Sequence, residues 1–250
     1  MHSLGQMSYQ HAWDLQEDWL RRATNRKQEA RERQAVPNPP IAQHLLLVEH
    51  PPVFTIGKSG NEENLLMNAE QRAEVGVEWV HTNRGGDITF HGPGQLVAYP
   101  LLDLEAIRPD IHWYMRSLEE TIIRTLAHWN IVGERYPGFT GVWIDATNPT
   151  KARKICAMGV RTSRWLTLHG LALNVTTNLG YFSGIVPCGI RSHGVTSIQV
   201  ERAAPPTLQE VASVFVESFS QVFNCRVNNE SMAAGSFSAV STLNEQPLAV

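Results

Sequence analysis

Residues 153–175 read RKICAMGVRTSRWLTLHGLALNV, and they contain two apolar, strand-like segments at 155–161 and 166–175 with a short turn between them. Further strand-like segments lie on either side, at 141–144 and 195–200. Strands that follow one another without intervening helices favour an antiparallel or mixed sheet. This half of the chain therefore predicts such a sheet.

The rest of the chain predicts further strands and the helices that cover them. Apolar residues at helical spacing predict a helix within 8–34 and another over about 110–129, with Asp110 as its N-cap. Thr207 and Glu210 form a capping-box pattern at the start of a final helix. Additional strands are predicted at 43–50, 53–57, 78–81 and 95–102, with a structured loop between the last two.

The predicted fold class is α+β: a single domain with a mixed β-sheet flanked by helices. We find neither an internal repeat nor a linker that would separate two domains. We expect a helical N-terminal segment over 1–35, packed on the domain or extending from it. A catalytic domain is expected over 36–228, and the Ser- and Ala-rich residues 229–250 predict a flexible tail.

Composition excludes several classes of protein. Hydrophobic residues make up 42% of the 250 residues, which is too apolar for a disordered chain. The net charge of −3 argues against nucleic acid as the main partner. No apolar run is long enough for a bilayer, and no signal-peptide pattern opens the sequence. Three cysteines without C-x-x-C spacing indicate thiols in a reducing cytoplasm, and the scattered histidines predict no bound metal.

Residues 84–95, RGGDITFHGPGQ, form the segment with the highest glycine content. Glycines at this density let the backbone approach a ligand closely, with N–H groups facing an oxygen. Arg84 and His91 add side chains that could hold a polar group. The alternative is a long hairpin loop whose glycines serve only the turn. Neither the P-loop nor the dinucleotide-binding pattern is present.

Three other segments carry candidate reactive groups. Lys154 enters an apolar strand, so its ammonium either ends in water or is desolvated and suited to proton transfer. Cys156 is interpreted as a small buried apolar residue. His169 is either a structural histidine or a residue that positions a partner. Cys188 lies between Pro187 and Gly189, where a turn either exposes a reactive sulfur or holds a structural one.

Together these segments resemble the lipoyl(octanoyl) transferase family over roughly residues 43–200. The motifs are HPPVFTIG at 50–57, residues 84–95, residues 154–161, residues 169–175 and Pro187-Cys188-Gly189, in the family's order. The resemblance implies a fold like the catalytic domains of biotin and lipoate protein ligases. It also implies transfer of an octanoyl group from octanoyl-acyl carrier protein to a lysine of lipoyl domains, the first step of endogenous lipoate cofactor synthesis.

The resemblance also implies roles for individual residues. Cys188 matches the nucleophile that forms an acyl-thioester, and Lys154 matches the general acid and base, so we expect Lys154→Ala to abolish transfer while folding survives. His169 is a supporting residue. The segments that match the substrate-binding lining contain Arg84, Gly85, Gly86, Asp87, Ile88, Thr89, Phe90, His91, Ala157, Met158, Gly159, Gly170, Leu171 and Ala172.

Thioester exchange is nearly thermoneutral, so the resemblance implies neither ATP nor metal as a cofactor. The implied acceptors are lipoyl domains of 2-oxoacid dehydrogenases and the glycine cleavage H protein. An acidic carrier protein as donor predicts a basic patch at the site, for which Arg153, Arg161, Arg164 and Arg191 are candidates. A monomer is expected.

Three rival functions remain at this stage. A lipoate or biotin protein ligase would share the fold class but would need ATP to form an acyl-adenylate. A binding protein for acyl chains or acyl carrier protein would need the pocket without Cys188 and Lys154. A cysteine peptidase would also use cysteine and histidine, but the residues around Cys188 match no peptidase signature.

Overall fold

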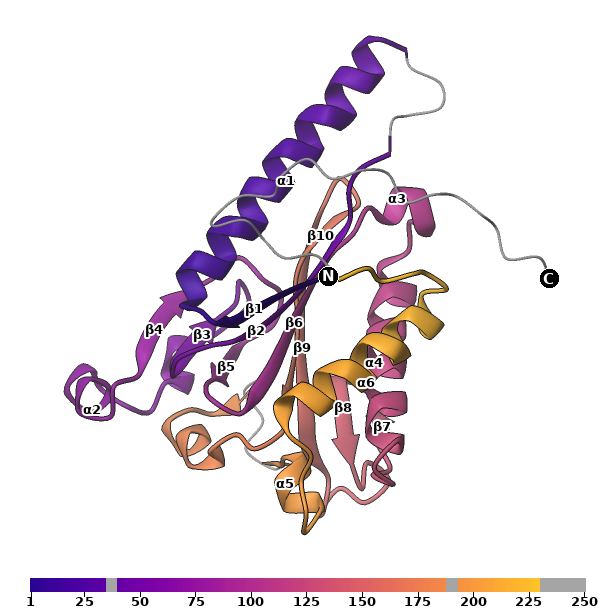
Figure 1. Ribbon diagram of the computed structural model, residues 1–250. Helices are drawn as coiled ribbons and strands as arrows, with labels where there is room; N and C mark the ends of the chain where they lie inside the picture. Colours follow the sequence, from indigo (N-terminus) through magenta and orange to yellow (C-terminus); the bar gives the residue numbers. More distant parts are fainter. Residues whose placement is uncertain (35–39, 188–192, 230–250) are drawn as a thin grey trace.

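The computed structural model describes residues 1–34, 40–187 and 193–229. Within these ranges a large mixed sheet has the strand order β1-β2-β6-β10-β9-β8-β7, with β11 also paired to β9. A smaller sheet has the order β4-β3-β5. The predicted mixed sheet flanked by helices is confirmed (Figure 1).

The strands of the large sheet come from most of the chain length. Their bounds are β1 His2–Gln6, β2 His44–Glu49, β6 Gln95–Leu101, β7 Glu134–Tyr136, β8 Phe139–Ile144, β9 Arg153–Ser163, β10 Leu166–Asn174 and β11 Gly194–Val195. Pairs β1–β2 and β9–β11 are parallel, and the other pairs of this sheet are antiparallel. The smaller sheet consists of β3 Val53–Ile56, β4 Glu78–His81 and β5 Ile88–His91.

Helices cover both faces of the large sheet. The helices and short 3₁₀ turns are α1 Tyr9–Glu32, η1 Glu62–Asn64, α2 Ala69–Glu74, α3 Leu104–Ile107, α4 Ile111–Ala127, η2 Leu179–Gly184, α5 Ile198–Glu201 and α6 Leu208–Val222. Figure 1 shows α1 on one side of the sheet and the pair α4 and α6 on the other.

Each helix buries one apolar face. Ala12, Leu15 and Trp19 of α1 pack with residues of β2, β6 and β10. Leu118 and Ile122 of α4 share a second core with residues of α6 and with the opposite face of the sheet. The capping box predicted at Thr207 and Glu210 is confirmed at the start of α6. The sheet is therefore buried on both sides and holds the site residues of β9 and β10 rigidly.

Two of the segments predicted from the sequence differ in the structure. The strand predicted at 195–200 is wrong beyond Val195, because Ser197 accepts a hydrogen bond from the backbone N–H of Val200 and caps helix α5. The loop predicted between 81 and 95 contains strand β5, which pairs with β3 from Val53↔His91 to Ile56↔Ile88. In both places the polar residues of the segment hid a short strand or helix, β5 or α5, which contacts with distant parts of the chain stabilise.

The N-terminal residues are joined to the main sheet. Strand β1 pairs in parallel with β2, and the Trp19 indole nitrogen of α1 donates a hydrogen bond to the Ala42 carbonyl. The expected domain boundary at residue 35 and, from residue 230 onward, the expected tail lie outside the described residues.

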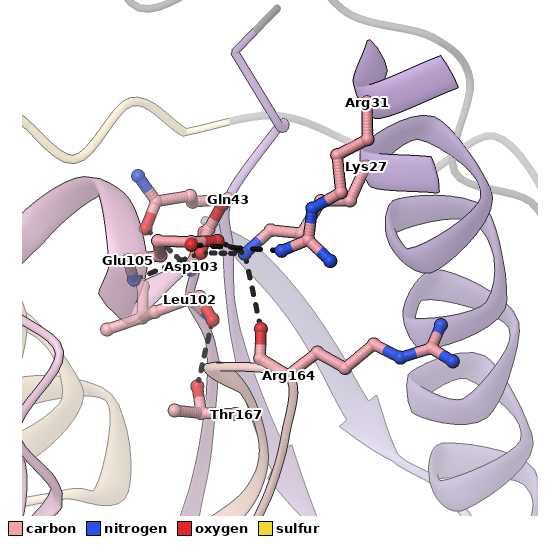
Figure 2. Close-up of polar contacts among 8 residues, drawn as sticks. All are labelled: Lys27, Arg31, Gln43, Leu102, Asp103, Glu105, Arg164 and Thr167. Atoms are coloured by element: carbon pink, nitrogen blue, oxygen red, sulfur yellow. Dashed lines mark hydrogen bonds and ion pairs between the residues drawn. The ribbon is translucent and has the colours of Figure 1, made fainter. Parts of the chain in front are cut away.

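Lys27 connects the far half of α1 to the sheet. Its Nζ lies 2.6 Å from Asp103 Oδ1 and 2.8 Å from a Glu105 carboxylate oxygen, and it donates to the Arg164 carbonyl at 3.2 Å (Figure 2). The side chains of Lys27 and Asp103 are each only 9% exposed. Arg164 is in the β9–β10 turn, where it adopts a positive φ of 51°. The contact therefore ties this turn and the start of α3 to α1.

We expect Lys27→Met to lower the free energy of unfolding by about 3 kcal/mol, because it leaves the buried Asp103 carboxylate without its ammonium partner. Urea unfolding followed by circular dichroism measures the change. Arg31→Met is the matched control: its guanidinium is 3.9 Å from Glu105 and its side chain is 63% exposed, so it should cost less than about 1 kcal/mol. Equal losses in the two variants would contradict this interpretation.

Candidate active site

A cavity lies where the glycine-rich loop and β5 meet β6, β9, β10 and the start of α1. The volume of this cavity is about 40 Å³. Among the predicted site residues, the following line this cavity: Arg84, Gly86, Asp87, Thr89, His91, Ala157, Met158, Gly159, His169, Gly170, Leu171 and Ala172. The structure thus brings together segments that are far apart in the sequence.

Three of the predicted substrate-binding residues, Gly85, Ile88 and Phe90, lie outside this lining. Ile88 and Phe90 are buried in a separate small core with Phe54 of β3 and Phe182 of η2. The Gly85 backbone N–H donates a hydrogen bond to the Val160 carbonyl at 2.9 Å. Ile88 and Phe90 therefore anchor β5, and Gly85 anchors the glycine-rich loop on β9.

Arg84 holds the glycine-rich loop in place. Its Nη2 donates to the Thr55 carbonyl at 2.7 Å and lies 3.0 Å from Thr55 Oγ1, and its Nη1 donates to the Gly85 carbonyl. The Arg84 side chain is buried. The buried guanidinium donates hydrogen bonds to the backbone carbonyls of Thr55 and Gly85. These bonds fix the position of the loop against the cavity.

Gly159 permits the close approach of this loop to β9. A Cβ atom at position 159 would lie 2.8 Å from the Gly85 carbonyl oxygen and 3.2 Å from Arg84 Cδ. The first distance is shorter than a Cβ–oxygen contact allows, and the obstructing atom belongs to the backbone. The residue at this position must therefore be glycine if the loop is to stay where it is.

We expect Gly159→Val to reduce the octanoyl transfer that the resemblance implies by about a hundredfold, because the displaced loop moves the cavity wall by an ångström or more. Steady-state kinetics measure the loss, with the melting temperature as a check on folding. Gly138→Ala in the β7–β8 turn is the control, since a Cβ there meets nothing within 4 Å, although its φ of +86° will lower stability slightly. Full activity of Gly159→Val would show that the loop position does not matter.

Two histidines, His91 and His169, line the cavity, and the ring of His50 lies 5.9 Å from that of His91. His91 Nδ1 lies 2.8 Å from Gln95 Oε1, and Gln95 in turn donates to Asn174 Oδ1 at 2.9 Å. His50 Nδ1 lies 2.7 Å from the Met7 carbonyl, and its Nε2 lies 2.8 Å from the Tyr99 hydroxyl. His169 has a φ of +57°, a conformation that non-glycine residues rarely adopt.

Burial keeps these histidines neutral. It lowers the pKa of His50 to about 4 and that of His169 to about 3, and it lowers the pKa of His91 well below its usual value. Arg84 adds to the effect on His91 and His169, because its positive charge disfavours a second cation nearby. At neutral pH the cavity is lined by uncharged rings, which suits an apolar ligand.

These pKa shifts predict that the protein loses stability as the pH falls from 7 to 5. The unfolded chain binds protons on its histidines below about pH 6.5, while the folded protein does not. A histidine whose pKa is about 4 when folded, such as His50, therefore costs about 2 kcal/mol at pH 5. Urea unfolding at both pH values measures the change, and a constant free energy of unfolding would contradict it.

Lys154 lies on β9, three residues before the cavity-lining Ala157. It pairs with Trp143 across to β8 and with Val195 of β11. The residue is 8% exposed, and its Nζ lies 4.7 Å from the centroid of the Trp143 ring. Of the two arrangements that the sequence left open, the structure has the desolvated one.

The three cysteines occupy different places. Cys156 is fully buried, and burial raises the pKa of its thiol far above the usual value, which agrees with its interpretation as a buried apolar residue. Cys225 is a free, exposed thiol beyond α6. Cys188 lies outside the described residues, as does Arg191.

The chain on both sides of residues 188–192 lies close to Lys154 or to the glycine-rich loop. Beyond them, the His193 ring lies 5.6 Å from the Trp143 ring, and Thr196 donates its backbone N–H to the Lys154 carbonyl at 2.9 Å. Before them, Val186 donates to the Asn64 carbonyl, and Asn64 contacts Asp87 of the glycine-rich loop.

Two of the expected basic residues are already engaged with acidic partners. Arg153 pairs with Glu201 and Asp145, and Arg161 pairs with Glu17. These carboxylates offset the positive charge that a basic patch would need, so the patch is not apparent at Arg153 and Arg161.

The sequence-based reasoning missed part of the cavity wall. Tyr9, Val97 and Tyr99 also line the cavity. Tyr9 is the first residue of α1, and its ring stacks on His91 with an interplanar angle of 18°. The sequence signal for this contribution was a tyrosine at the start of a helix with one apolar face. Only the fold shows that this helix face packs on the sheet next to the cavity.

Among residues 1–34, 40–187 and 193–229 we find no group of three histidine, cysteine, aspartate or glutamate side chains placed to hold a metal ion. No helix in these ranges is long and apolar enough to span a membrane.

The fold and the site define a catalytic-domain architecture: a mixed sheet flanked by helices, with a cavity on β9 and β10 and the buried Lys154 on β9. The model of the lipoyl protein ligase A/B catalytic domain matches residues 8–220. An octanoyltransferase of Flavobacterium psychrophilum is 47% identical over 91% of this chain and 97% of its own length. One from Cytophaga hutchinsonii is 46% identical over 90% and 93%. The chain therefore belongs to the octanoyltransferases of this catalytic-domain family.

Solved structures agree on the fold. A bipartite lipoate protein ligase from Thermoplasma acidophilum has a TM-score of 0.67 and 16% identity, covering 94% of this chain and 87% of that one. At this identity the likeness concerns the fold alone, and the predicted ligase-like fold is confirmed. The prediction of an acyltransferase of the octanoyltransferase family is also confirmed.

Proposed function

We propose that this protein transfers an octanoyl group from octanoyl-acyl carrier protein to a lysine of lipoyl domains. The reaction passes through an acyl-thioester on Cys188, with Lys154 as general acid and base. Membership of the octanoyltransferases supports the acyl group and the acceptor. The observation that carries the mechanism is the position of Lys154, a buried cation on the strand that also lines the acyl cavity.

In the first half-reaction, the Cys188 thiolate attacks the thioester carbonyl and the bond to the pantetheine sulfur breaks. The Lys154 ammonium gives a proton to the departing sulfur, so the carrier leaves as a neutral thiol. Lys154 is then a neutral amine.

In the second half-reaction, the amine of the target lysine attacks the acyl-Cys188 carbonyl. Lys154 takes a proton from the attacking nitrogen, an amide bond forms, and Cys188 leaves as a thiolate. Both groups return to their starting protonation states. The two steps exchange one acyl bond for another, so the scheme uses neither ATP nor metal.

The octanoyl chain would occupy the cavity that β9 and β10 line. Ala157, Met158, Leu171 and Ala172 supply apolar wall from two neighbouring strands, and the histidines there are uncharged. The flexible Met158 side chain is suited to adjust to the shape of the alkyl chain.

The rival assignment is an ATP-dependent lipoate ligase, because the ligase structures share the fold. We would incubate the protein with a lipoyl domain and either octanoyl-acyl carrier protein without ATP, or free octanoate with ATP. The proposal predicts octanoylation of the lipoyl-domain lysine in the first mixture and none in the second. The reverse pattern would assign the protein to the ligases. Cytoplasmic location and a monomeric state stay predictions.

A further inference from the structure

Glu17, on α1, gathers hydrogen-bond donors from three parts of the chain. Its Oε1 accepts from Trp13 Nε1 at 3.0 Å, from Asn83 Nδ2 at 2.8 Å and from Arg161 Nη1 at 2.6 Å. Asn83 immediately precedes the glycine-rich loop, and Arg161 belongs to β9. One carboxylate thus joins α1 to two walls of the cavity.

This carboxylate determines which way the Asn83 amide faces. An ionised carboxylate only accepts hydrogen bonds, so the Asn83 NH₂ group must point to Glu17. The Asn83 oxygen then points to His169, whose Nε2 lies 2.7 Å away. Because an amide oxygen only accepts, the His169 Nε2 atom must carry the hydrogen.

The tautomer of His169 also decides whether its Nδ1 atom can accept a hydrogen bond from the Tyr9 hydroxyl. A neutral His169 with its hydrogen on Nε2 has a bare Nδ1, and this atom lies 3.4 Å from the Tyr9 oxygen. Burial raises the pKa of Tyr9 to about 12, so the phenol keeps its hydrogen. The bare Nδ1 is an acceptor within reach of it, and the hydroxyl also has hydrogen bonds with Thr82 and Arg84. The His169 backbone N–H donates to Gln16 Oε1 at 2.8 Å, which holds the residue against α1.

We propose that Glu17 and Asn83 are positioning residues that hold His169 in its Nε2–H tautomer and so keep its Nδ1 available as an acceptor for the Tyr9 hydroxyl at the cavity wall. This inference rests on the proposed function, since it concerns how the cavity receives an alkyl group. A donor that faced the alkyl chain would lose its hydrogen bond when the ligand displaced water, which weakens binding. The network satisfies that donor before the ligand arrives.

Two variants separate this role from a merely structural one. Asn83→Leu removes the acceptor of Nε2–H, so His169 should take up the Nδ1–H form at least in part. The double variant Glu17→Gln with Asn83→Asp exchanges the positions of the amide and the carboxylate. The glutamine NH₂ group then donates to the aspartate, and the aspartate still accepts the hydrogen bond from His169 Nε2. The swap keeps the net charge and should restore the tautomer.

The tautomer is read by ¹⁵N NMR of histidine-labelled protein without substrate. We expect Nε2–H in the wild type and in the swap, and a mixture in Asn83→Leu. With octanoyl-acyl carrier protein, the KM of Asn83→Leu should rise about tenfold with kcat within about twofold, because one unmatched donor costs binding and not chemistry. The swap should recover most of the KM. Asp14→Asn, on the exposed face of α1, is the control that changes neither reading.

Several results would overturn the inference: an Nδ1–H wild type, an unchanged tautomer in Asn83→Leu, or a changed tautomer with an unchanged KM. If Asn83→Leu does not fold, Glu17→Leu removes the same restraint and is judged by the same criteria. A wild-type protein that transfers no octanoyl group would refute the proposed function, and with it the claim that the tautomer affects KM. The NMR reading would still decide the tautomer part.

Discussion

Lys154→Met is expected to lower kcat for octanoyl transfer by about a thousandfold, because the variant can neither protonate the departing thiol nor accept the proton of the target lysine. The protein should stay folded. Methionine fills most of the lysine volume, and the loss of the cation–π contact with Trp143 is partly offset by no longer burying a charge. Single-turnover assays measure the rate, and circular dichroism checks the fold.

Lys151→Met is the control for this variant. Lys151 is exposed and only three residues away in the chain, so it reports any general effect of removing a positive charge from this region. We expect it to transfer octanoyl groups at nearly the wild-type rate. An active Lys154→Met protein would remove Lys154 from the mechanism, whatever its position in the structure.

Cys188→Ala is expected to abolish transfer altogether, because no other nucleophile is assigned to accept the octanoyl group. Cys156→Ala is the matched control. Cys156 is fully buried, and burial holds the pKa of its thiol far above the usual range, so it provides no thiolate at neutral pH. The same assay with a lipoyl domain should show transfer by Cys156→Ala only. Equal loss in both variants would indicate a structural effect of removing a thiol.

The parts of the fold that follow from local pattern were predictable. Segment 155–161 falls within β9, segment 166–175 matches β10 to within one residue, and the Thr207 capping box starts α6. Alternation and capping depend on neighbours in sequence, so these elements could be predicted. Strand β1 was not predicted, since its place depends on pairing with β2, some forty residues later. Likewise β5 depends on β3, not on its own residues.

The same distinction applies to the candidate site. The glycine-rich loop was found because its glycines indicate close backbone approach, whereas Gly159 was inferred only from the resemblance to the family. The positive φ of His169 could not be read from its own residues. The contribution of α1 was missed. Tyr9 and Glu17 reach the cavity through contacts with Asn83 and His169, which lie between 66 and 160 residues away in the sequence. Such contacts leave no local signal.

The central claim is that the acyl group passes through a covalent intermediate on Cys188. The most direct test is intact-protein and peptide mass spectrometry after incubation with octanoyl-acyl carrier protein without ATP, beside Cys188→Ser. We predict a hydroxylamine-labile octanoyl adduct on Cys188 that disappears when a lipoyl domain is added. The absence of an adduct, with lipoyl-domain modification appearing only when ATP and free octanoate are supplied, would contradict the account.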